Sequence, residues 1–500
     1  MRSPERAALA IVFTTMAGAC TESGTALDVS PTLSSLAVAP LEISPAFSPD
    51  VHDYVVRCAP GGNSLSVIMS APPGVVATVR PVVAPTAVNA AGVSMSVEEG
   101  DPIVVDVASG GRTDQYWVRC LPHDFPWITV QKHPEAGTPT PGWYVLGNAT
   151  PAHNETGFVV VLDARGTPIW YRQVGSAGAF STDVLPDSAL AYVAALGYYG
   201  ADSDARYVVQ RLSPWQSRTI AAVGAPIDEH ELRLLPNGDV LVFAYQQLAD
   251  VDLRGLQSFG ADATILDCAV QEIDPAGRLI WEWRASEHVD PVRESTGPSA
   301  LPMGATSVID VFHFNSIDVD AAGNLLLSAR NTSSVFYVDR ATGRVRWKLG
   351  GTAFSKDGAQ TIRVVDDPEG GFGSQHDARF QQNGHVSVFD DHSGLQGPAR
   401  GVEYAIDFDS GTARIAWSYP GLQNASAMGS FRRYPDGSNI IAWGIPSDPT
   451  SFAGAFTEVD DAGHDLLDVN FEQGDATYRA FKVPLAALDL GVLRATAGRR

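Results

Sequence analysis

Three things are scarce in this sequence of 500 residues: cysteine, positive charge and long apolar segments. It has 4 cysteines, and its 34 lysine and arginine residues are outnumbered by 57 aspartate and glutamate residues, for a formal net charge of −23. So acidic a chain repels polyanions, and we expect no nucleic-acid partner and no binding to an anionic membrane surface. After the first twenty residues no apolar run is long enough for a membrane-spanning helix. Any membrane attachment would therefore come from a lipid anchor.

The first twenty residues predict export. Arg2 and Arg6 precede a short apolar run, which ends in the small residues Gly18 and Ala19 and then Cys20. This order is typical of a secretory signal, and a cysteine directly after the small residues is what lipoprotein processing requires. We expect residues 1–20 to be a signal peptide with a lipobox-like end, lipidation at Cys20, and a cell envelope lipoprotein of the periplasm or outer membrane. Plain secretion is the alternative.

Export also permits disulfides among the other three cysteines. Cys58 ends the strand-like segment DYVVRC and Cys120 ends the similar segment QYWVRC. Two strands with matching ends would bring the two sulfurs together, so we predict a Cys58–Cys120 disulfide. Cys268, inside ILDCAVQEID, is then expected to be a free cysteine buried in a strand.

Turn-forming residues are abundant, since the chain has 47 glycines and 33 prolines. This composition favours an all-β fold. Residues 27–122 alternate apolar and polar positions without helical periodicity. Their opening string, SSLAVAPLEISPAFSPDVHDYVVRC, resembles the cadherin-like β-sandwich modules of bacterial surface proteins. We expect a small β-sandwich here that acts as a spacer or packing module.

Two hairpin patterns then recur over residues 125–490. The first has an apolar strand, an Asp, a Gly turn and a strand that closes on Trp, as in VVVLDARGTPIWY and AVQEIDPAGRLIWEW. The second lies between copies of the first, as in ELRLLPNGDVLVFA and DARFQQNGHVSVFD. Two hairpins per repeat make a four-stranded sheet, and about six repeats of such a sheet predict a six-bladed β-propeller. We expect the late strand near residues 477–486 to complete the circle.

Histidines recur at one position of the second hairpin. Eight residues before the turn glycines Gly238, Gly323 and Gly384 stand His230, Asn315 and His376, respectively. His313 precedes Asn315 by two residues, so both side chains can point to the same face of a strand. Because the first strand of each blade lines the central channel, we expect these side chains to converge at one end of it. Arg330 follows the return strand of the hairpin and should reach the same rim.

This cluster has other interpretations. A propeller repeats its strands, so a polar residue at each strand start can be purely structural. Clustered histidines can also hold a metal, but no carboxylate is obviously placed in that register, since Asp377, Glu229 and Glu231 should alternate away from it. We therefore expect no metal and no other cofactor.

At these residues the chain resembles the bacterial arylsulfate sulfotransferases. The resemblance rests on HFNSIDVDAAGNLLLSARNTS, RVRWKLGG, SQHDARF and DEHELRLLPNGDVLV, and covers most of residues 125–486. It implies a six-bladed propeller preceded by a small β-sandwich. It also implies transfer of a sulfuryl group from a phenolic sulfate ester to a phenol, without a nucleotide sulfate donor (PAPS), by a ping-pong route through a sulfohistidine.

The same resemblance assigns roles to residues. His376 would be the nucleophile, Asn315 and Arg330 would bind the sulfuryl oxygens, and His230 or His313 would serve as acid and base. The sequence does not distinguish between these two histidines, nor does it fix the oligomeric state, for which a homodimer is one option. One departure is Asp377, where well-studied members have a small hydroxyl residue.

Two further functions stay open at the level of the sequence. One is a non-catalytic propeller of the envelope that binds an anionic ligand at the same cationic rim. The other is a lyase or hydrolase that uses the histidines as acid and base, or around a metal. A covalent sulfuryl group on His376 would be expected from the sulfotransferase alone.

Overall fold

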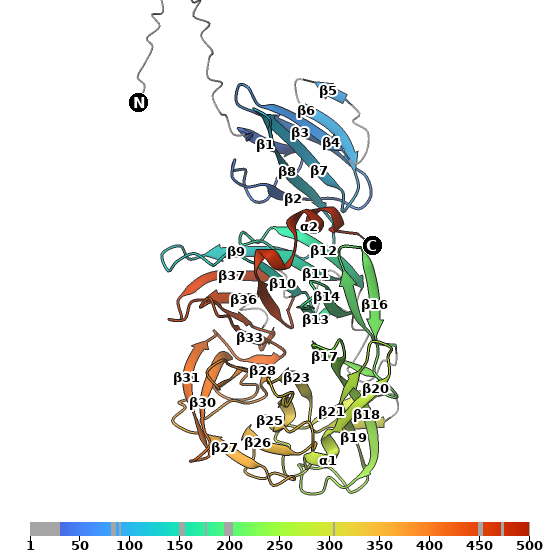
Figure 1. The fold of residues 1–500 in the computed structure, drawn as a ribbon, viewed down its shortest axis with the longest axis vertical. Helices are drawn as coiled ribbons and strands as arrows, with labels where there is room; N and C mark the ends of the chain where they lie inside the picture. The colour runs from blue at the N-terminus through green and yellow to red at the C-terminus, as the bar shows by residue number, and fades with distance from the viewer. Residues whose placement is uncertain are drawn as a thin grey trace, which may run out of the picture.

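The computed structural model describes residues 31–81, 87–89, 92–149, 156–175, 178–194, 204–303, 306–448, 454–471 and 475–499. The predicted signal peptide and the predicted lipidation site Cys20 lie outside these ranges. In Figure 1 a small β-sandwich lies above a ring of sheets, with the helix α2 (Leu490–Thr496) between them. Within the described ranges no helix is long and apolar enough to cross a membrane.

The β-sandwich consists of two four-stranded sheets with strand orders β1-β3-β6-β5 and β2-β8-β7-β4. Alternate residues of these strands point inward, as in β1, where Leu36 and Val38 are buried between exposed neighbours. The sandwich is therefore as expected, while its likeness to cadherin modules stays a prediction. The strands are β1 (Ser35–Ala39), β2 (Asp53–Arg57), β3 (Asn63–Ser70), β4 (Val76–Pro81), β5 (Ala87–Asn89), β6 (Gly92–Val97), β7 (Pro102–Ser109) and β8 (Arg112–Leu121).

The predicted disulfide is present. Cys58 follows β2 and Cys120 lies in β8, and these two strands pair in parallel, with Val56 opposite Cys120. The Cα atoms of the two cysteines are 5.5 Å apart, which is within the usual span of a disulfide. Cys268 is a buried free cysteine in the core of the ring, also as predicted.

In the rest of the chain, a β-propeller, antiparallel pairing groups the described strands into six four-stranded units. The fourth and fifth of these form one nine-stranded sheet, because β27 pairs in parallel with β26 and with β31. The first two units contain β10 (Trp143–Gly147), β11 (Gly157–Leu162), β12 (Pro168–Gly175) and β38 (Ala480–Val483), then β13 (Ala179–Val184), β14 (Leu190–Ala194), β15 (Tyr207–Arg211) and β16 (Gln216–Ile220). The next two contain β17 (Ile227–Leu234), β18 (Val240–Val251), β19 (Ala263–Ile273) and β20 (Leu279–Arg284), then β23 (Phe314–Val319), β24 (Leu325–Ala329), β25 (Ser334–Val338) and β26 (Val345–Gly350).

The fifth unit contains β28 (His376–Phe380), β29 (Val386–Asp390), β30 (Arg400–Asp407) and β31 (Thr412–Pro420). The sixth contains β33 (Ser430–Arg433), β34 (Asn439–Ala442), β36 (Gly454–Val459) and β37 (Asp465–Phe471). Smaller elements connect or extend these sheets: β21 (Ser299–Met303), β22 (Thr306–Asp310), β27 (Gln360–Val364), β32 (Ala425–Ala427), β35 (Ile445–Pro446), α1 (Ala285–His288), η1 (Arg330–Thr332) and η2 (Leu485–Ala487).

The ring is closed from both sides by strands that are distant in sequence. β9 (Ile128–Lys132) pairs with β37 at the outer edge of the sixth unit. β38 pairs with β10 at the inner edge of the first unit. The late strand that was expected to complete the circle is β38, and the first unit is the one it completes.

The recurrent Asp and Gly of the first hairpin make its tight turn. In the β19–β20 hairpin, Oδ1 of Asp274 accepts hydrogen bonds from the backbone N–H groups of Ala276 and Arg278. Gly277 has φ +80°, which glycine adopts without a Cβ penalty. The same arrangement is found at Asp163 and Gly166. This pair of residues is visible as a repeat in the sequence because each copy of the turn needs it.

The sandwich and the propeller are joined by polar and apolar contacts. Arg494 on α2 donates two hydrogen bonds to Asp53 on β2, and buried Arg119 on β8 donates to the backbone carbonyl of Arg494. A cavity of about 670 Å³ lies along this junction beside Arg57 and Trp127. None of the predicted site residues lines that cavity.

Candidate active site

The three predicted histidines stand where the inner strands of three successive units are irregular. The pairing register shifts between Ile227 and Leu232 on β17, between Phe314 and Ser316 on β23, and between His376 and Arg379 on β28. Such β-bulges locally redirect side chains and are frequent beside active sites. At His313 the backbone φ is +54°, which a non-glycine residue seldom adopts.

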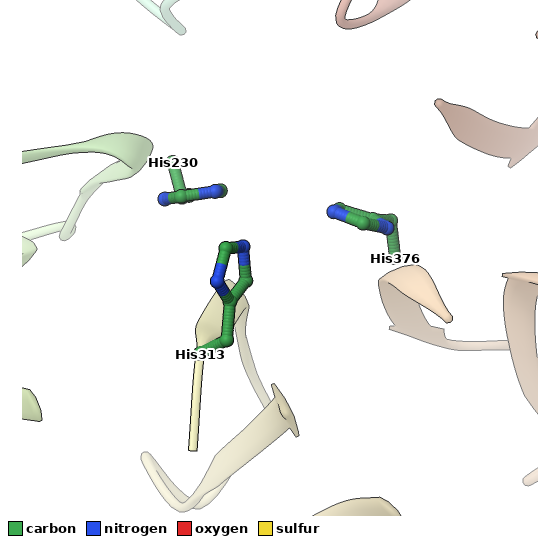
Figure 2. A group of neighbouring side chains, drawn as sticks. All are labelled: His230, His313 and His376. Carbon is green, nitrogen blue, oxygen red and sulfur yellow. The ribbon is translucent and has the colours of Figure 1, made fainter. Parts of the chain in front are cut away.

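These irregularities bring His230, His313 and His376 together. Their ring centroids are 4.9 Å apart for His230 and His313, 6.3 Å for His313 and His376, and 6.5 Å for His230 and His376. All three side chains are buried. Figure 2 shows the rings turned toward a common space, each approaching from a different strand. The convergence expected from the sequence register is what the structure contains.

Each of the three rings is held by its own buried carboxylate, which the sequence analysis did not foresee. Nδ1 of His376 lies 2.7 Å from Oδ2 of Asp391, which directly follows β29. The other two pairs have the same form, and all three carboxylates are fully buried. They are His230 Nδ1 with Asp228 Oδ1 at 2.6 Å and His313 Nδ1 with Asp310 Oδ2 at 2.7 Å. With Nδ1 engaged, Nε2 is the atom that each ring can offer to a ligand or substrate.

Burial and neighbouring charges shift the pKa values of these groups. Burial, the Arg330 guanidinium and the other two histidines together hold the pKa of His376 well below its ordinary value. Burial raises the pKa of Asp391, so both members of this pair resist becoming charged. Burial is also the main cause of the lowered pKa of His313. At His230 burial opposes protonation, but the charge and hydrogen bond of Asp228 outweigh it and raise the pKa.

Arg330 lies at the rim of this cluster. Its backbone N–H donates to the carbonyl oxygen of His313 at 2.9 Å, which fixes the start of η1 against β23. The guanidinium donates to the Ser426 carbonyl at 3.0 Å and to Oγ of Ser393 at 3.4 Å, and it lowers the pKa of both His313 and His376. A permanent positive charge therefore stands beside the imidazoles, as the sequence predicted.

Asn315 is fully buried between β23 and β28. Its Nδ2 donates to the carbonyl oxygen of Gln375 at 2.8 Å, directly before His376, while its Oδ1 has no partner among the described residues. The contact that the structure gives Asn315 thus positions the backbone of His376. Its expected donation to a sulfuryl oxygen stays a prediction.

Beneath the histidines lies a buried network of charges. Glu231 accepts hydrogen bonds from Arg379 at 2.6 Å and from Arg479 at 3.0 Å, and Arg379 also bonds Asp377 at 2.7 Å. Burial alone would raise the pKa of Glu231, but these arginines lower it to about 2. Asp377 also binds Arg432, at 2.6 Å, so its carboxylate is neutralised by arginines. The residue that departs from the family pattern therefore adds no uncompensated negative charge to the site.

Tyr478 completes the wall of the site from the far end of the chain. Its ring stands edge-on to His230 and His376, with centroids 5.6 and 6.1 Å away, and its hydroxyl donates to the Asn315 carbonyl at 3.2 Å. Its neighbour Arg479 donates to the same carbonyl at 2.8 Å. Neither residue was singled out by the sequence analysis, because they precede β38 and belong to no repeated hairpin.

Fold and site together define a β-propeller with a buried, three-histidine centre next to an arginine. The sequence model described as arylsulfotransferase (ASST) matches residues 199–444, a range that contains all three histidines and Arg330. This part of the chain is similar to the arylsulfotransferase family, as the resemblance indicated. The family match supports aryl sulfotransferase activity in general terms. No curated protein matches the chain in sequence.

Solved structures resemble the chain only distantly. A protein of unknown function from Bacteroides caccae is 12% identical, with a TM-score of 0.42, over 69% of this chain and 99% of that one. A streptogramin B lyase is 9% identical, with a TM-score of 0.30, over 80% and 98%. The hydrazine synthase of Kuenenia stuttgartiensis is 12% identical, with a TM-score of 0.35, over 72% and 90%. Similarities this weak carry no argument about what this chain does.

Proposed function

We propose that the protein transfers a sulfuryl group from a phenolic sulfate ester to a phenol, through a covalent sulfohistidine on His376. The observation that carries this proposal is the pairing of His376 with Asp391 inside a three-histidine centre that lies within the family match. With the Nδ1 proton held by the carboxylate, the lone pair of Nε2 is available to attack sulfur.

In the first half-reaction Nε2 of His376 forms a bond to sulfur while the bond from sulfur to the phenolic oxygen breaks. The leaving phenoxide takes a proton from His230 or His313. In the second half the acceptor phenol returns a proton to that ring, its oxygen bonds to sulfur, and the sulfur–nitrogen bond breaks. The raised pKa of His230 favours it over His313 as the proton carrier.

The surrounding charges suit this reaction. The sulfuryl group carries negative charge on three oxygens as it moves, and Arg330 offers donors that remain charged at any working pH. Attack leaves a positive charge on the sulfated imidazole ring, and this charge favours the ionised form of Asp391, which then balances it. No cofactor or nucleotide takes part. We further propose that residues 125–490 form the catalytic domain, with residues 27–122 as a spacer, in an exported protein anchored through lipid on Cys20.

Intact mass spectrometry after brief mixing with p-nitrophenyl sulfate tests this proposal directly. We expect a gain of about 80 Da, the mass of one sulfuryl group, with release of nitrophenolate and loss of the adduct when phenol is added. His376→Asn should give neither adduct nor turnover. His392→Asn is the matched control, since His392 is also buried and bonded to an aspartate, Asp390, but is not part of the three-histidine centre. A folded wild-type protein that binds the ester without adduct or nitrophenolate would instead be an anion-binding propeller.

A further inference from the structure

The three carboxylates behind the histidines have imidazoles as their hydrogen-bonded basic partners. Asp228, Asp310 and Asp391 are fully buried, and within the described residues no lysine or arginine donates a hydrogen bond to them. One oxygen of each, Oδ2 of Asp228 and Oδ1 of the other two, is buried without a partner in that part of the chain. Burying carboxylates without compensation costs free energy. A cation bound by the imidazoles would offset this cost, in addition to the Arg330 guanidinium at the rim of the site.

The arrangement resembles a metal site in which each histidine ligand already has the hydrogen bond that orients its ring. A histidine that binds a metal through one ring nitrogen usually donates its other N–H to a carboxylate or carbonyl, which fixes the ring. All three histidines have this contact, each to a different aspartate. Side chains that only line a channel would not need three separate carboxylates at hydrogen-bond distance from Nδ1.

The distances are close to those that a metal needs. One ligand atom from each of His230, His313 and His376 lies within 4.8 Å of the others. With bonds of 2.0–2.1 Å in a tetrahedral site, the three nitrogens would be about 3.3 Å apart, so the rings need to approach by up to about 1.5 Å. Rotation of the rings about their side-chain bonds supplies a movement of that size without a change of fold.

We propose that Nε2 of His230, His313 and His376 binds one divalent transition-metal ion of the zinc type. Imidazole ligands favour Zn²⁺, Co²⁺, Ni²⁺ and Cu²⁺ over Mg²⁺ and Ca²⁺, which prefer oxygen. Three histidines leave a fourth position open for water or an anion. Asp228, Asp310 and Asp391 are positioning residues for the ligands.

This site goes beyond the proposed sulfuryl transfer and does not depend on it, but the two are linked through one atom. Nε2 of His376 cannot both hold a metal and attack sulfur, because each uses the same lone pair. Metal and sulfuryl group should therefore exclude one another. Occupancy by zinc would then be a means of switching the transferase off.

Equilibrium dialysis of the untagged full chain tests the proposal, after removal of metals with EDTA and with Zn²⁺ and Co²⁺ as probes. We expect one ion per chain, and the visible absorption of tetrahedral Co²⁺. His313→Ala should abolish both, and Asp310→Asn should weaken binding by about 10- to 100-fold. Two controls should bind as wild type: His392→Asn, and His133→Gln, which alters a separate group of His133, Asp465 and Asp468.

The results of these experiments test the metal site and the proposed sulfuryl transfer separately. Absence of binding, octahedral Co²⁺, or equal binding by His313→Ala would overturn the metal site, whatever the activity. If binding is found, sulfation of the EDTA-treated protein is then measured with and without Zn²⁺. Loss of the adduct in proportion to zinc occupancy supports mutual exclusion. An adduct that forms fully on the zinc-loaded protein contradicts Nε2 of His376 as a ligand.

Discussion

Nδ1 of His376 lies 2.7 Å from Oδ2 of Asp391, and both side chains are buried. In the tautomer that shares its Nδ1 proton with this carboxylate, the lone pair lies on Nε2, the nitrogen that we propose as the nucleophile. The same contact recurs at His230 and His313, so the site is a set of three oriented imidazoles rather than three independent side chains.

Replacing Asp391 by asparagine should slow sulfation of His376 by about 10²- to 10⁴-fold without unfolding the protein. An asparagine amide can donate to Nδ1 and stabilise the tautomer in which Nε2 carries the proton and cannot attack. Rapid-quench measurement of adduct formation gives the rate, and ¹⁵N chemical shifts of the ring report the tautomer. A normal rate together with an unchanged tautomer would contradict the positioning role of Asp391.

Arg330→Ala should lower the rate of sulfuryl transfer by about 10²-fold, because it removes the charged donor at the rim of the site. Arg330→Lys should recover only part of this, since a lysine lacks the planar pair of donors. Steady-state kinetics with a series of phenyl sulfates would reveal the effect. If alanine and lysine variants both match wild type, Arg330 does not contact the transferred group.

Glu231→Gln should destabilise the propeller by about 3–5 kcal/mol, because Arg379 and Arg479 would lose their shared buried partner. Urea denaturation measures the loss, with the exposed Glu287→Gln as a control for removal of a glutamate charge. Equal stability of the two variants would mean that Asp377 alone balances both arginines.

The junction of β9 and β37 should depend on pH through His133. Its Nε2 lies 2.8 Å from Asp468 Oδ2 and its Nδ1 lies 3.5 Å from Glu135, and the hydrogen bond to Asp468 is the main cause of its raised pKa, with Asp465 also contributing. A raised pKa stabilises the fold below the ordinary value of about 6.5, and this contribution is lost as pH rises through the higher folded value.

Wild type should therefore lose stability relative to His133→Gln between pH 6 and 9, by less than about 1 kcal/mol because the pair is partly exposed. Thermal unfolding of both proteins across that range isolates the contribution of this histidine. A difference that stays constant with pH would assign the raised pKa no role in stability.

The sequence predicted the fold well because its repeats are local. Asp274 and Gly277 form a turn through contacts within a few residues. Each copy of this hairpin therefore needs the same residue types at these positions. The convergence of the histidines was predictable for the same reason, since His230 and His376 share one register relative to the turn glycines and His313 lies two residues before it.

The aspartate partners could not be predicted from strand alternation. Alternation assumes regular strands, but His313 has φ +54° and Asp377 has φ +58°, so the direction of the side chains changes at each bulge. Asp310 ends β22, an added strand outside the repeat, and Asp391 comes from a neighbouring strand end. Asp228 and Asp310 lie two and three residues before His230 and His313, which is visible in the sequence. The pattern did not show, however, that their side chains point toward the histidines.

Closure of the ring has a consequence for when the protein becomes active. His133 and Asp468 are 335 residues apart, yet their contact joins the two edges of the circle. Pairing over such a distance is slow and comes late in folding. Tyr478 and Arg479 directly precede β38, so a chain in which β38 has not yet paired with β10 lacks this wall of the site. The site is therefore complete only once β38 has joined β10, so closure of the ring must precede the proposed chemistry.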